Sequence, residues 1–256
     1  MDYIVCIPSY KRADVCKNKT MNMLKINNIN PEKIYIYVAD EIEYDIYKNT
    51  LDNSTYNKII VGVKGLVSQR QFICEQWPEH QCIFSLDDDI QAVDLSISPF
   101  QNLDVFLIHA FNECIKQKAY IWGVYPVNNP FFMKGKKEIV TGLNYIIGAF
   151  YGFINRANLE PLKIALEFSG NKEDIERTLK YFLHDGIVLR FNKICFKTKY
   201  YGTDGGGLGT FKNRLEPALQ AAKILKEHYS DYGDIKIRKN GMAEFVFKRK
   251  WSNGNK

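Results

Sequence analysis

The sequence has no paired cysteines, few histidines and no long apolar segment, and each absence excludes a class of protein. Its six cysteines are scattered without a Cys-x-x-Cys pair, and there are only four histidines. We therefore expect reduced, mostly buried thiols and neither a zinc site nor a disulfide framework. No stretch reaches membrane-spanning length and the N-terminus lacks the pattern of a signal peptide, which predicts a soluble, cytoplasmic protein without a membrane segment.

The composition is that of a chain with a substantial core. Of the 256 residues, 46% are hydrophobic and 14% aromatic, which excludes a disordered chain and favours one continuous domain over residues 1–256. The formal charge of +6 is a mild excess that permits a polyanionic partner such as nucleic acid without requiring one. Composition gives no indication of the oligomeric state.

The first hundred residues alternate between β-branched runs and helical patterns. Strands are predicted at Tyr3–Ile7, Ile34–Ala39, Lys58–Val63 and Cys82–Leu86, and helices at Ala13–Asn27 and Leu66–Trp77. This alternation predicts βαβ units and a parallel sheet covered on both faces. Ligands of such sheets bind beyond the carboxyl ends of the strands, where polar residues follow three of the predicted strands.

The second half is predicted to add further strands and helices to the same domain. Helices are expected at Leu103–Lys118, Ile175–Leu183 and Leu215–Tyr229, and strands at Tyr120–Val127, Tyr145–Ile154, Ile187–Lys197 and as a short pair within Ile235–Phe247. The fold class is therefore α/β, with a mixed, mostly parallel central sheet flanked by helices. A basic tail, Lys248–Lys250, follows the last strand.

Three adjacent carboxylates, Asp87, Asp88 and Asp89, follow the apolar run Cys82–Leu86. Such a cluster repels itself unless a cation binds, and oxygen ligands suit Mg²⁺ or Mn²⁺, which bridge carboxylates to substrate phosphates. The alternative is an acidic turn or helix start after a strand. The cluster by itself does not separate the two interpretations.

Two further segments have the composition of a nucleotide-binding edge. Pro8-Ser9-Tyr10-Lys11-Arg12 offers backbone N–H groups, a hydroxyl, an aromatic ring and two cations, although a Pro-Ser turn also serves as a helix cap. In the second, Gly65 allows close backbone approach and Arg70, one turn later, is placed to reach a pyrophosphate or the aspartates. Its alternative is an ordinary surface arginine.

Glu173 and Asp174 open a predicted helix, and a glycine-rich segment lies further along the chain. Acids at a helix N-terminus are favoured by the helix dipole, so capping competes with a role as general base toward an acceptor hydroxyl. Gly205, Gly206 and Gly207 form either a substrate loop or a plain connector.

The order of these motifs resembles the GT-A glycosyltransferases over nearly the whole chain up to about Phe196. The resemblance implies a transfer from a nucleotide-diphosphate sugar, UDP-sugar first among them, assisted by Mn²⁺ or Mg²⁺. It makes residues 1–100 the nucleotide-sugar-binding half and residues 101–256 the acceptor-binding half with a C-terminal helix. The residues it implies for donor binding are Pro8, Ser9, Tyr10, Arg12, Asp40, Gly65, Arg70, Asp87 and Asp88.

The same resemblance assigns chemical roles to the acidic residues. Asp87 and Asp89 match the Asp-x-Asp motif, with Asp89 the more direct metal ligand and Asp87 nearer the ribose. Asp174 matches the catalytic base of inverting members and Glu173 its companion. The further histidine ligand common in such enzymes has no clear match in this sequence.

More narrowly, the segments Ser-Tyr-Lys-Arg, Gly-Leu-Val-Ser-Gln-Arg-Gln and Asp-Asp-Asp-Ile and the late Gly205-Gly206-Gly207 loop look like the TET/JBP-associated glycosyltransferases, which accompany DNA base hydroxylases in phages and large DNA viruses. That resemblance implies a hydroxymethylated pyrimidine in DNA as acceptor and, for a virus-encoded protein, the host cytoplasm. The alternatives are a protein, lipid or glycan acceptor, a sugar-phosphate nucleotidyltransferase, and a non-catalytic DNA-binding module.

Overall fold

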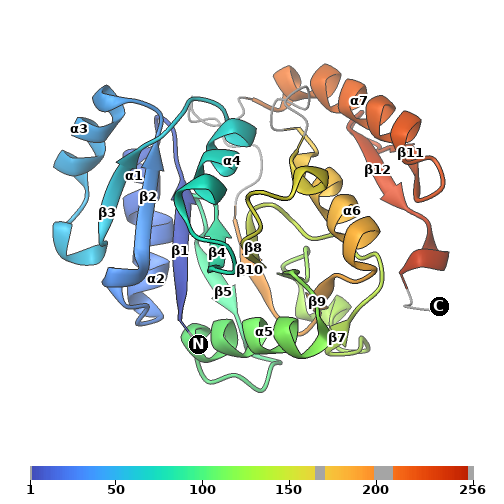
Figure 1. Ribbon diagram of the computed structural model, residues 1–256, viewed down its shortest axis with the longest axis horizontal. Helices are drawn as coiled ribbons and strands as arrows, with labels where there is room; N and C mark the ends of the chain where they lie inside the picture. The colour runs from blue at the N-terminus through green and yellow to red at the C-terminus, as the bar shows by residue number, and fades with distance from the viewer. Residues whose placement is uncertain (1, 165–170, 199–209, 253–256) are drawn as a thin grey trace.

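The computed structural model describes residues 2–164, 171–198 and 210–252, and its centre is an eight-stranded sheet (Figure 1). In spatial order its strands are β3 (Lys58–Val61), β2 (Ile34–Val38), β1 (Tyr3–Pro8), β4 (Cys82–Leu86), β8 (Phe150–Ile154), β6 (Ile121–Val124), β9 (Leu189–Phe191) and β7 (Ile139–Val140). Two small sheets accompany it, formed by β5 (Ala92–Asp94) with β10 (Cys195–Lys197), and by β11 (Gly233–Ile237) with β12 (Ala243–Phe247).

Helices cover both faces of the central sheet. They are α1 (Ala13–Cys16), the π-helical turn Lys17–Met21, α2 (Asn22–Ile26), α3 (Glu41–Thr50), α4 (Leu66–Gln76), α5 (Leu103–Gln117), α6 (Glu173–Asp185) and α7 (Phe211–His228). Short 3₁₀ turns lie at Pro31–Lys33, Asn53–Thr55, Pro130–Phe132, Glu160–Leu162 and Arg249–Trp251. Among the described residues, no helix combines the length and apolarity needed to cross a membrane.

The strand directions place six carboxyl ends at one edge of the sheet. β1, β2, β3 and β4 pair in parallel, and β8 runs antiparallel between β4 and β6, so that β6 and its parallel partner β9 point the same way as β4. The chain leaves β1 and β4 at this edge, directly before Ser9 and Asp87. The α/β class and the mixed central sheet flanked by helices are thus confirmed.

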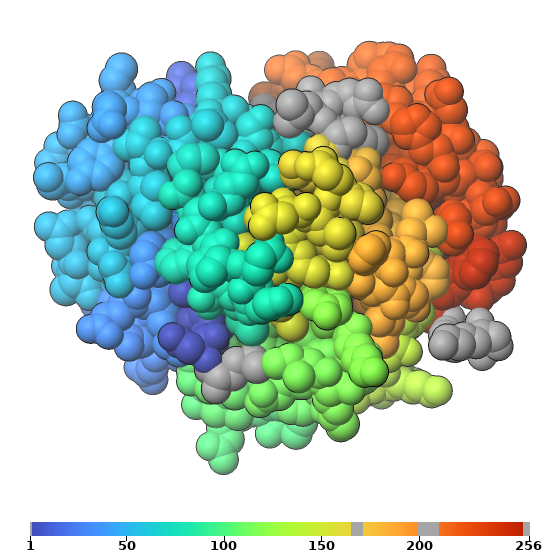
Figure 2. All heavy atoms as spheres, in the orientation of Figure 1, coloured from blue at the N-terminus to red at the C-terminus, as the bar shows by residue number. Residues whose placement is uncertain are grey.

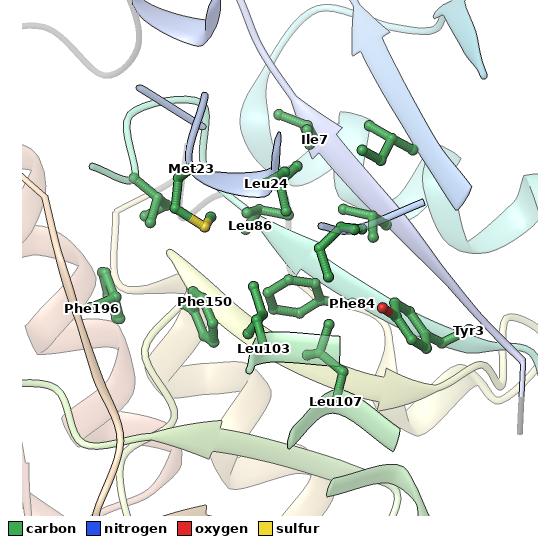
Figure 3. Close-up of a cluster of buried hydrophobic side chains, with 14 of the residues drawn as sticks. Tyr3, Ile7, Met23, Leu24, Phe84, Leu86, Leu103, Leu107, Phe150 and Phe196 are labelled. Atoms are coloured by element: carbon green, nitrogen blue, oxygen red, sulfur yellow. The ribbon is translucent and has the colours of Figure 1, made fainter. Parts of the chain in front are cut away.

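The larger core fills one face of the sheet, beneath α1, α2 and α5. Buried side chains of the strands, such as Phe84 and Phe150, meet Leu24 from α2 and Leu103 and Leu107 from α5 (Figure 3). Phe84 and Phe150 pack edge to face, with ring centroids 4.7 Å apart. Because both faces of the sheet are covered at β1 and β4, every residue of these two strands is buried, and their sequences form apolar runs.

The opposite face is covered by α4 and α6, and α7 with the β11–β12 hairpin packs beyond α6. Ile73 of α4 and Tyr181 of α6 pack on this face, while Leu179 of α6 joins Leu225 of α7 and Phe245 of β12 in a separate cluster. In the space-filling view the orange and red C-terminal residues form one flank of the molecule, opposite the blue N-terminal residues (Figure 2).

The structure corrects several predicted elements. The strand expected at Tyr145–Ile154 begins only at Phe150, and the one expected at Ile187–Lys197 is two strands, β9 and β10, that belong to different sheets. Helix α3 and strand β5 were not predicted. The helical pattern of α3 was missed because Tyr47 is its only buried apolar residue, and its N-terminus is defined by the cap of Asp40. All six cysteines are free thiols, and five are buried, as expected.

Candidate active site

The three aspartates after β4 point to three different sets of partners. Asp87 accepts a hydrogen bond from Arg70 (Nη2–Oδ1, 2.9 Å), and Asp88 accepts one from the Ser9 hydroxyl (Oγ–Oδ2, 2.5 Å). Arg12 spans the other two carboxylates, with its Nη1 2.9 Å from Oδ1 of Asp88 and its Nη2 2.8 Å from Oδ2 of Asp89. The charge of the acidic turn is therefore partly offset by Arg12, which follows β1, and Arg70 on α4.

The Pro8-Ser9 segment contacts the aspartate cluster and does not cap a helix. Arg12 occupies the N-cap position of α1 and makes no side-chain capping bond there, while the Ser9 hydroxyl lies 2.5 Å from the hydroxyl of Tyr47 on α3 as well as bonding Asp88. Ser9 is 7% exposed and Asp88 4% exposed, so their contact is internal. Pro8 is the last residue of β1, buried directly before them.

Arg70 joins the two halves of the chain. Its guanidinium contacts Asp87, pairs with Glu173 at the start of α6, and donates to the carbonyl oxygen of Gly148 at 2.7 Å. Glu173 also pairs with Arg177 one turn further along α6, and its side chain is only 4% exposed. A buried acid held by two arginines fixes the beginning of α6 against the carboxyl end of β4.

Asp174 is held beside this bridge by the loop before β8. The Tyr145 hydroxyl and the Gly148 backbone N–H, 3.1 Å away, both donate to its Oδ2, and the Ile175 N–H donates to Oδ1. A methyl group on Gly148 would lie 2.9 Å from atoms of Arg70 and Glu173 and 3.1 Å from Cβ of Asp174. Only a glycine therefore fits here without displacing the network.

Burial raises the pKa of two of the clustered carboxyls. The pKa of Asp88 rises from 3.8 to about 7 because burial outweighs the opposing effects of Arg12 and Ser9. The pKa of Asp87 rises to about 6, again through burial, which exceeds the effect of Arg70. Dense protein surrounds Asp87, yet 36% of its side chain is accessible, so a ligand can reach it.

The remaining predicted donor residues lie around the ends of β1, β2 and β3. The Lys11 and Lys64 ammonium groups lie 5.3 and 5.7 Å from the centre of the Tyr10 ring, and Gly65 follows Lys64 with φ of 101°, a conformation that favours glycine. Asp40 caps α3 by accepting from the N–H of Glu43, whose own carboxylate accepts from the Lys11 N–H at 2.7 Å.

The carboxylate oxygens of this cluster suit a hard divalent cation whose coordination shell is completed by a bound ligand. Among the described residues no group of three or more His, Cys, Asp or Glu side chains forms a ready cation cage. The second oxygen of Asp87 carries no bond from the described residues, while Asp89 accepts from Arg12 and from the Thr198 hydroxyl at 2.6 Å. One or two carboxylates supplemented by phosphates and water are the usual environment of Mg²⁺.

Several residues of this site escaped the sequence-based reasoning. Tyr145 and Gly148 lie in a segment that was predicted to be a strand. Arg177 and Thr198 belong to no recognisable sequence motif. A tyrosine and a glycine a few residues before a buried strand could have been noted as a loop at the ligand edge, but their partners are more than twenty residues away in sequence. Gly205, Gly206 and Gly207 lie outside the described residues, so their predicted role stays a prediction.

Comparisons with known proteins place this arrangement in a fold class. No family model matches the chain, and no curated protein is similar in sequence. Among solved structures, the mannosyltransferase PcManGT from Pyrobaculum calidifontis, in complex with GDP-Man and Mn²⁺, aligns with a TM-score of 0.54 at 12% identity over 90% of this chain and 64% of that one. S. aureus TarS 1-349 in complex with UDP aligns at 0.51 and 11% identity over 88% of this chain and 72% of that one.

These likenesses establish the fold. The chain has the GT-A fold, in which the carboxyl ends of the parallel strands border the ligand site. It spans 44% of the longer TarS chain, to which it aligns with a TM-score of 0.51. At 11–12% identity the likeness is one of architecture.

Proposed function

We propose that this protein is a metal-dependent glycosyltransferase that moves a sugar from a nucleotide-diphosphate sugar to an acceptor hydroxyl. The observation that carries the proposal is the Arg70 bridge, which joins Asp87 after β4 to Glu173 beside Asp174. Acidic groups from segments 87 residues apart are thereby brought to one edge of a GT-A sheet. Two similar folds have been solved with UDP and with GDP-Man and Mn²⁺, which supports a donor of this class.

The residues of the first hundred positions are proposed to bind the donor. Tyr10 offers a ring for the base beside the cations of Lys11 and Lys64, and Arg12 is placed to exchange its contacts with Asp88 and Asp89 for the donor phosphates. Asp87 and Asp89 would hold the cation through their remaining lone pairs. When bound, Mn²⁺ or Mg²⁺ would offset the negative charge of the leaving diphosphate.

Asp174 is proposed as the base that accepts the proton of the acceptor hydroxyl. Its carboxylate is oriented by Tyr145 and Gly148, and Glu173 is engaged by two arginines, which leaves Asp174 as the member of the pair suited to proton transfer. The hydroxyl oxygen would form its bond to the anomeric carbon as the bond to the diphosphate oxygen breaks. Attack from the side opposite the leaving group inverts the anomeric configuration.

For the acceptor we propose DNA carrying a hydroxymethylated pyrimidine, in line with the resemblance to the TET/JBP-associated enzymes. The charge distribution supports a polyanion: residues 210–252 contain ten Lys and Arg against five Asp and Glu, so this region supplies most of the +6 excess. A modified base would have to leave the helical stack to reach Asp174. A protein, lipid or glycan acceptor remains the alternative, to be separated by experiment.

Calorimetric titration with UDP and Mn²⁺ tests the donor site. Wild type should bind UDP only with the metal, and Asp89→Ala should weaken that binding at least tenfold, whereas Asp174→Asn should bind UDP normally and lose sugar transfer. Equal binding by wild type and Asp89→Ala would contradict the donor site. Release of pyrophosphate from a nucleoside triphosphate and a sugar phosphate would identify a nucleotidyltransferase instead.

The acceptor is tested with hydroxymethylated DNA and a panel of labelled nucleotide sugars. Label should enter the DNA with wild type and not with Asp174→Asn. Turnover on a glycan with every DNA substrate inactive would remove DNA as acceptor. A protein that binds DNA but neither UDP nor any nucleotide sugar would be the non-catalytic module.

A further inference from the structure

A second cationic cluster lies at the ends of β6 and β9, away from the aspartates. Tyr125, directly after β6, has the guanidinium of Arg190 from β9 5.7 Å from its ring centre and the ammonium of Lys136 5.4 Å from the same ring. The loop that carries Lys136 is fixed to the turn after β9, because the Asn192 side chain donates to the carbonyl of Lys137 at 3.0 Å. Two cations are thus held at one aromatic ring.

Neither cation has an acidic partner in the described part of the chain. Among residues 2–164, 171–198 and 210–252, no carboxylate forms an ion pair with Arg190 or Lys136, and the one side-chain bond of the guanidinium runs from Nε to Oδ1 of Asn192 at 2.9 Å. Burial lowers the pKa of Arg190 to about 10. By contrast, Arg70 and Arg156 are each paired with an acid, Asp87 and Asp185.

The cluster lies on the same side of the sheet as the proposed base. Along β6 the buried residues alternate, with Ile121 and Gly123 on the face covered by α4 and α6, so Tyr125 continues on that face. Arg190 is the partner of Gly123 in β9 and shares its orientation. A methyl group on Gly123 would lie 2.8 Å from Ile146, so the segment that holds Asp174 packs directly over β6 at this point.

The strand register gives the separation of the cluster from Asp87. Ser85 of β4 and Gly123 of β6 both pair with Tyr151 of β8. Two residues further along β4, Asp87 donates its N–H to the carbonyl oxygen of Ala149. If the same register is continued from Gly123, Tyr125 lies level with Asp87 and two strands away from it. At the usual strand spacing, the two residues are roughly 10 Å apart. A sugar bound between the two positions would have the aspartates on one side and the cations on the other.

We propose that Arg190 and Lys136, with Tyr125 between them, form an anion subsite that takes a phosphate group of the acceptor. The Nη groups of the planar Arg190 guanidinium make no hydrogen bond to any described residue and match phosphate oxygens, and the exposed Lys136 ammonium supplies a second charge. The anion site follows from the unpaired cations alone, whereas its assignment to the acceptor rests on the proposed transferase function. Free phosphate, phosphomonoesters and phosphodiesters share this chemistry.

Titration of inorganic phosphate into the full chain at constant ionic strength tests the subsite. Wild type should bind one phosphate saturably, Arg190→Gln should weaken binding about tenfold or more, and Lys136→Gln should weaken it several-fold. Lys134→Gln is the matched control, since it removes the same charge from an exposed position in the same loop and should change the affinity less than twofold. Dimethyl phosphate and phenyl phosphate as ligands then separate a diester from a monoester source.

The results of these titrations distinguish failure of the anion subsite from failure of the proposed donor site. No saturable phosphate binding by wild type, or the same loss in Lys134→Gln and Lys136→Gln, would overturn the subsite. Because Lys136 is exposed, its substitution leaves the fold intact even where Arg190→Gln is unstable. UDP binding with Mn²⁺ should be equal in wild type and Lys136→Gln. Failure of wild type to bind UDP would instead reject the proposed donor while leaving the phosphate result valid.

Discussion

Arg70→Met should be among the most damaging single substitutions in this protein. The guanidinium contacts Asp87 at 2.9 Å, the Gly148 carbonyl at 2.7 Å and Glu173, and only 7% of the Arg70 side chain is exposed. Methionine has a similar length, so the substitution removes the charge and the hydrogen bonds with little change in volume. It removes the arginine that pairs with Asp87 and one of the two arginines that pair with Glu173.

Removing one partner of a buried ion pair destabilises a protein by about 3–5 kcal/mol. At about 2 °C per kcal/mol for a chain of this size, the melting temperature should fall by about 6–10 °C. Calorimetric or dichroism melting measures the change. Gln71→Met is the control, because Gln71 is the next residue of α4 and its side chain bonds Glu75 on the surface, so its effect should stay within about 0.5 kcal/mol.

A double-mutant cycle with Glu173→Gln tests whether the bridge couples the two halves. Since Arg70 and Glu173 are in contact, the double variant should be less destabilised than the sum of the single variants by about 0.5–3 kcal/mol. Additive effects, or a melting temperature of Arg70→Met within about 1 °C of Gln71→Met, would refute the argument that this bridge holds α6 at the end of β4.

Three further predictions concern the same site. Gly148→Ala should lower sugar transfer at least tenfold because the added methyl would displace Arg70 and Glu173, while Gly135→Ala, which meets nothing within 4 Å, should be neutral in the same assay. Tyr145→Phe should reduce kcat about tenfold with an unchanged donor KM, since it removes the hydrogen bond from the Tyr145 hydroxyl to Asp174; a changed KM would place Tyr145 in donor binding. The metal-free protein should lose stability as the pH rises from 4 to 7, because the raised pKa values of Asp88 and Asp87 let the folded state hold protons that the unfolded state releases; Asp88→Asn should make this melting profile less steep, and an unchanged profile would contradict the assignment.

The sequence by itself determined the elements that are buried on both faces. Continuous apolar runs such as Tyr3–Ile7 and Cys82–Leu86 predict central strands, because a parallel strand under two helical layers has no polar face. The polar residues that follow those runs lie together at one edge of the sheet, as predicted, since the carboxyl ends of parallel strands meet on one side. Burial on both faces leaves a local run of apolar residues, which can be recognised in the sequence.

Tertiary structure alone decided which acids, arginines and loop residues meet. Arg70 and Glu173 are 103 residues apart, and nothing near either one indicates the other. Tyr145 continues an apolar pattern typical of a strand, yet it lies in a loop and orients Asp174. Pairing across the sheet is fixed by register and by the packing of α4 and α6, which depend on the whole core, so a site built from opposite halves of the chain emerges only when that core has formed.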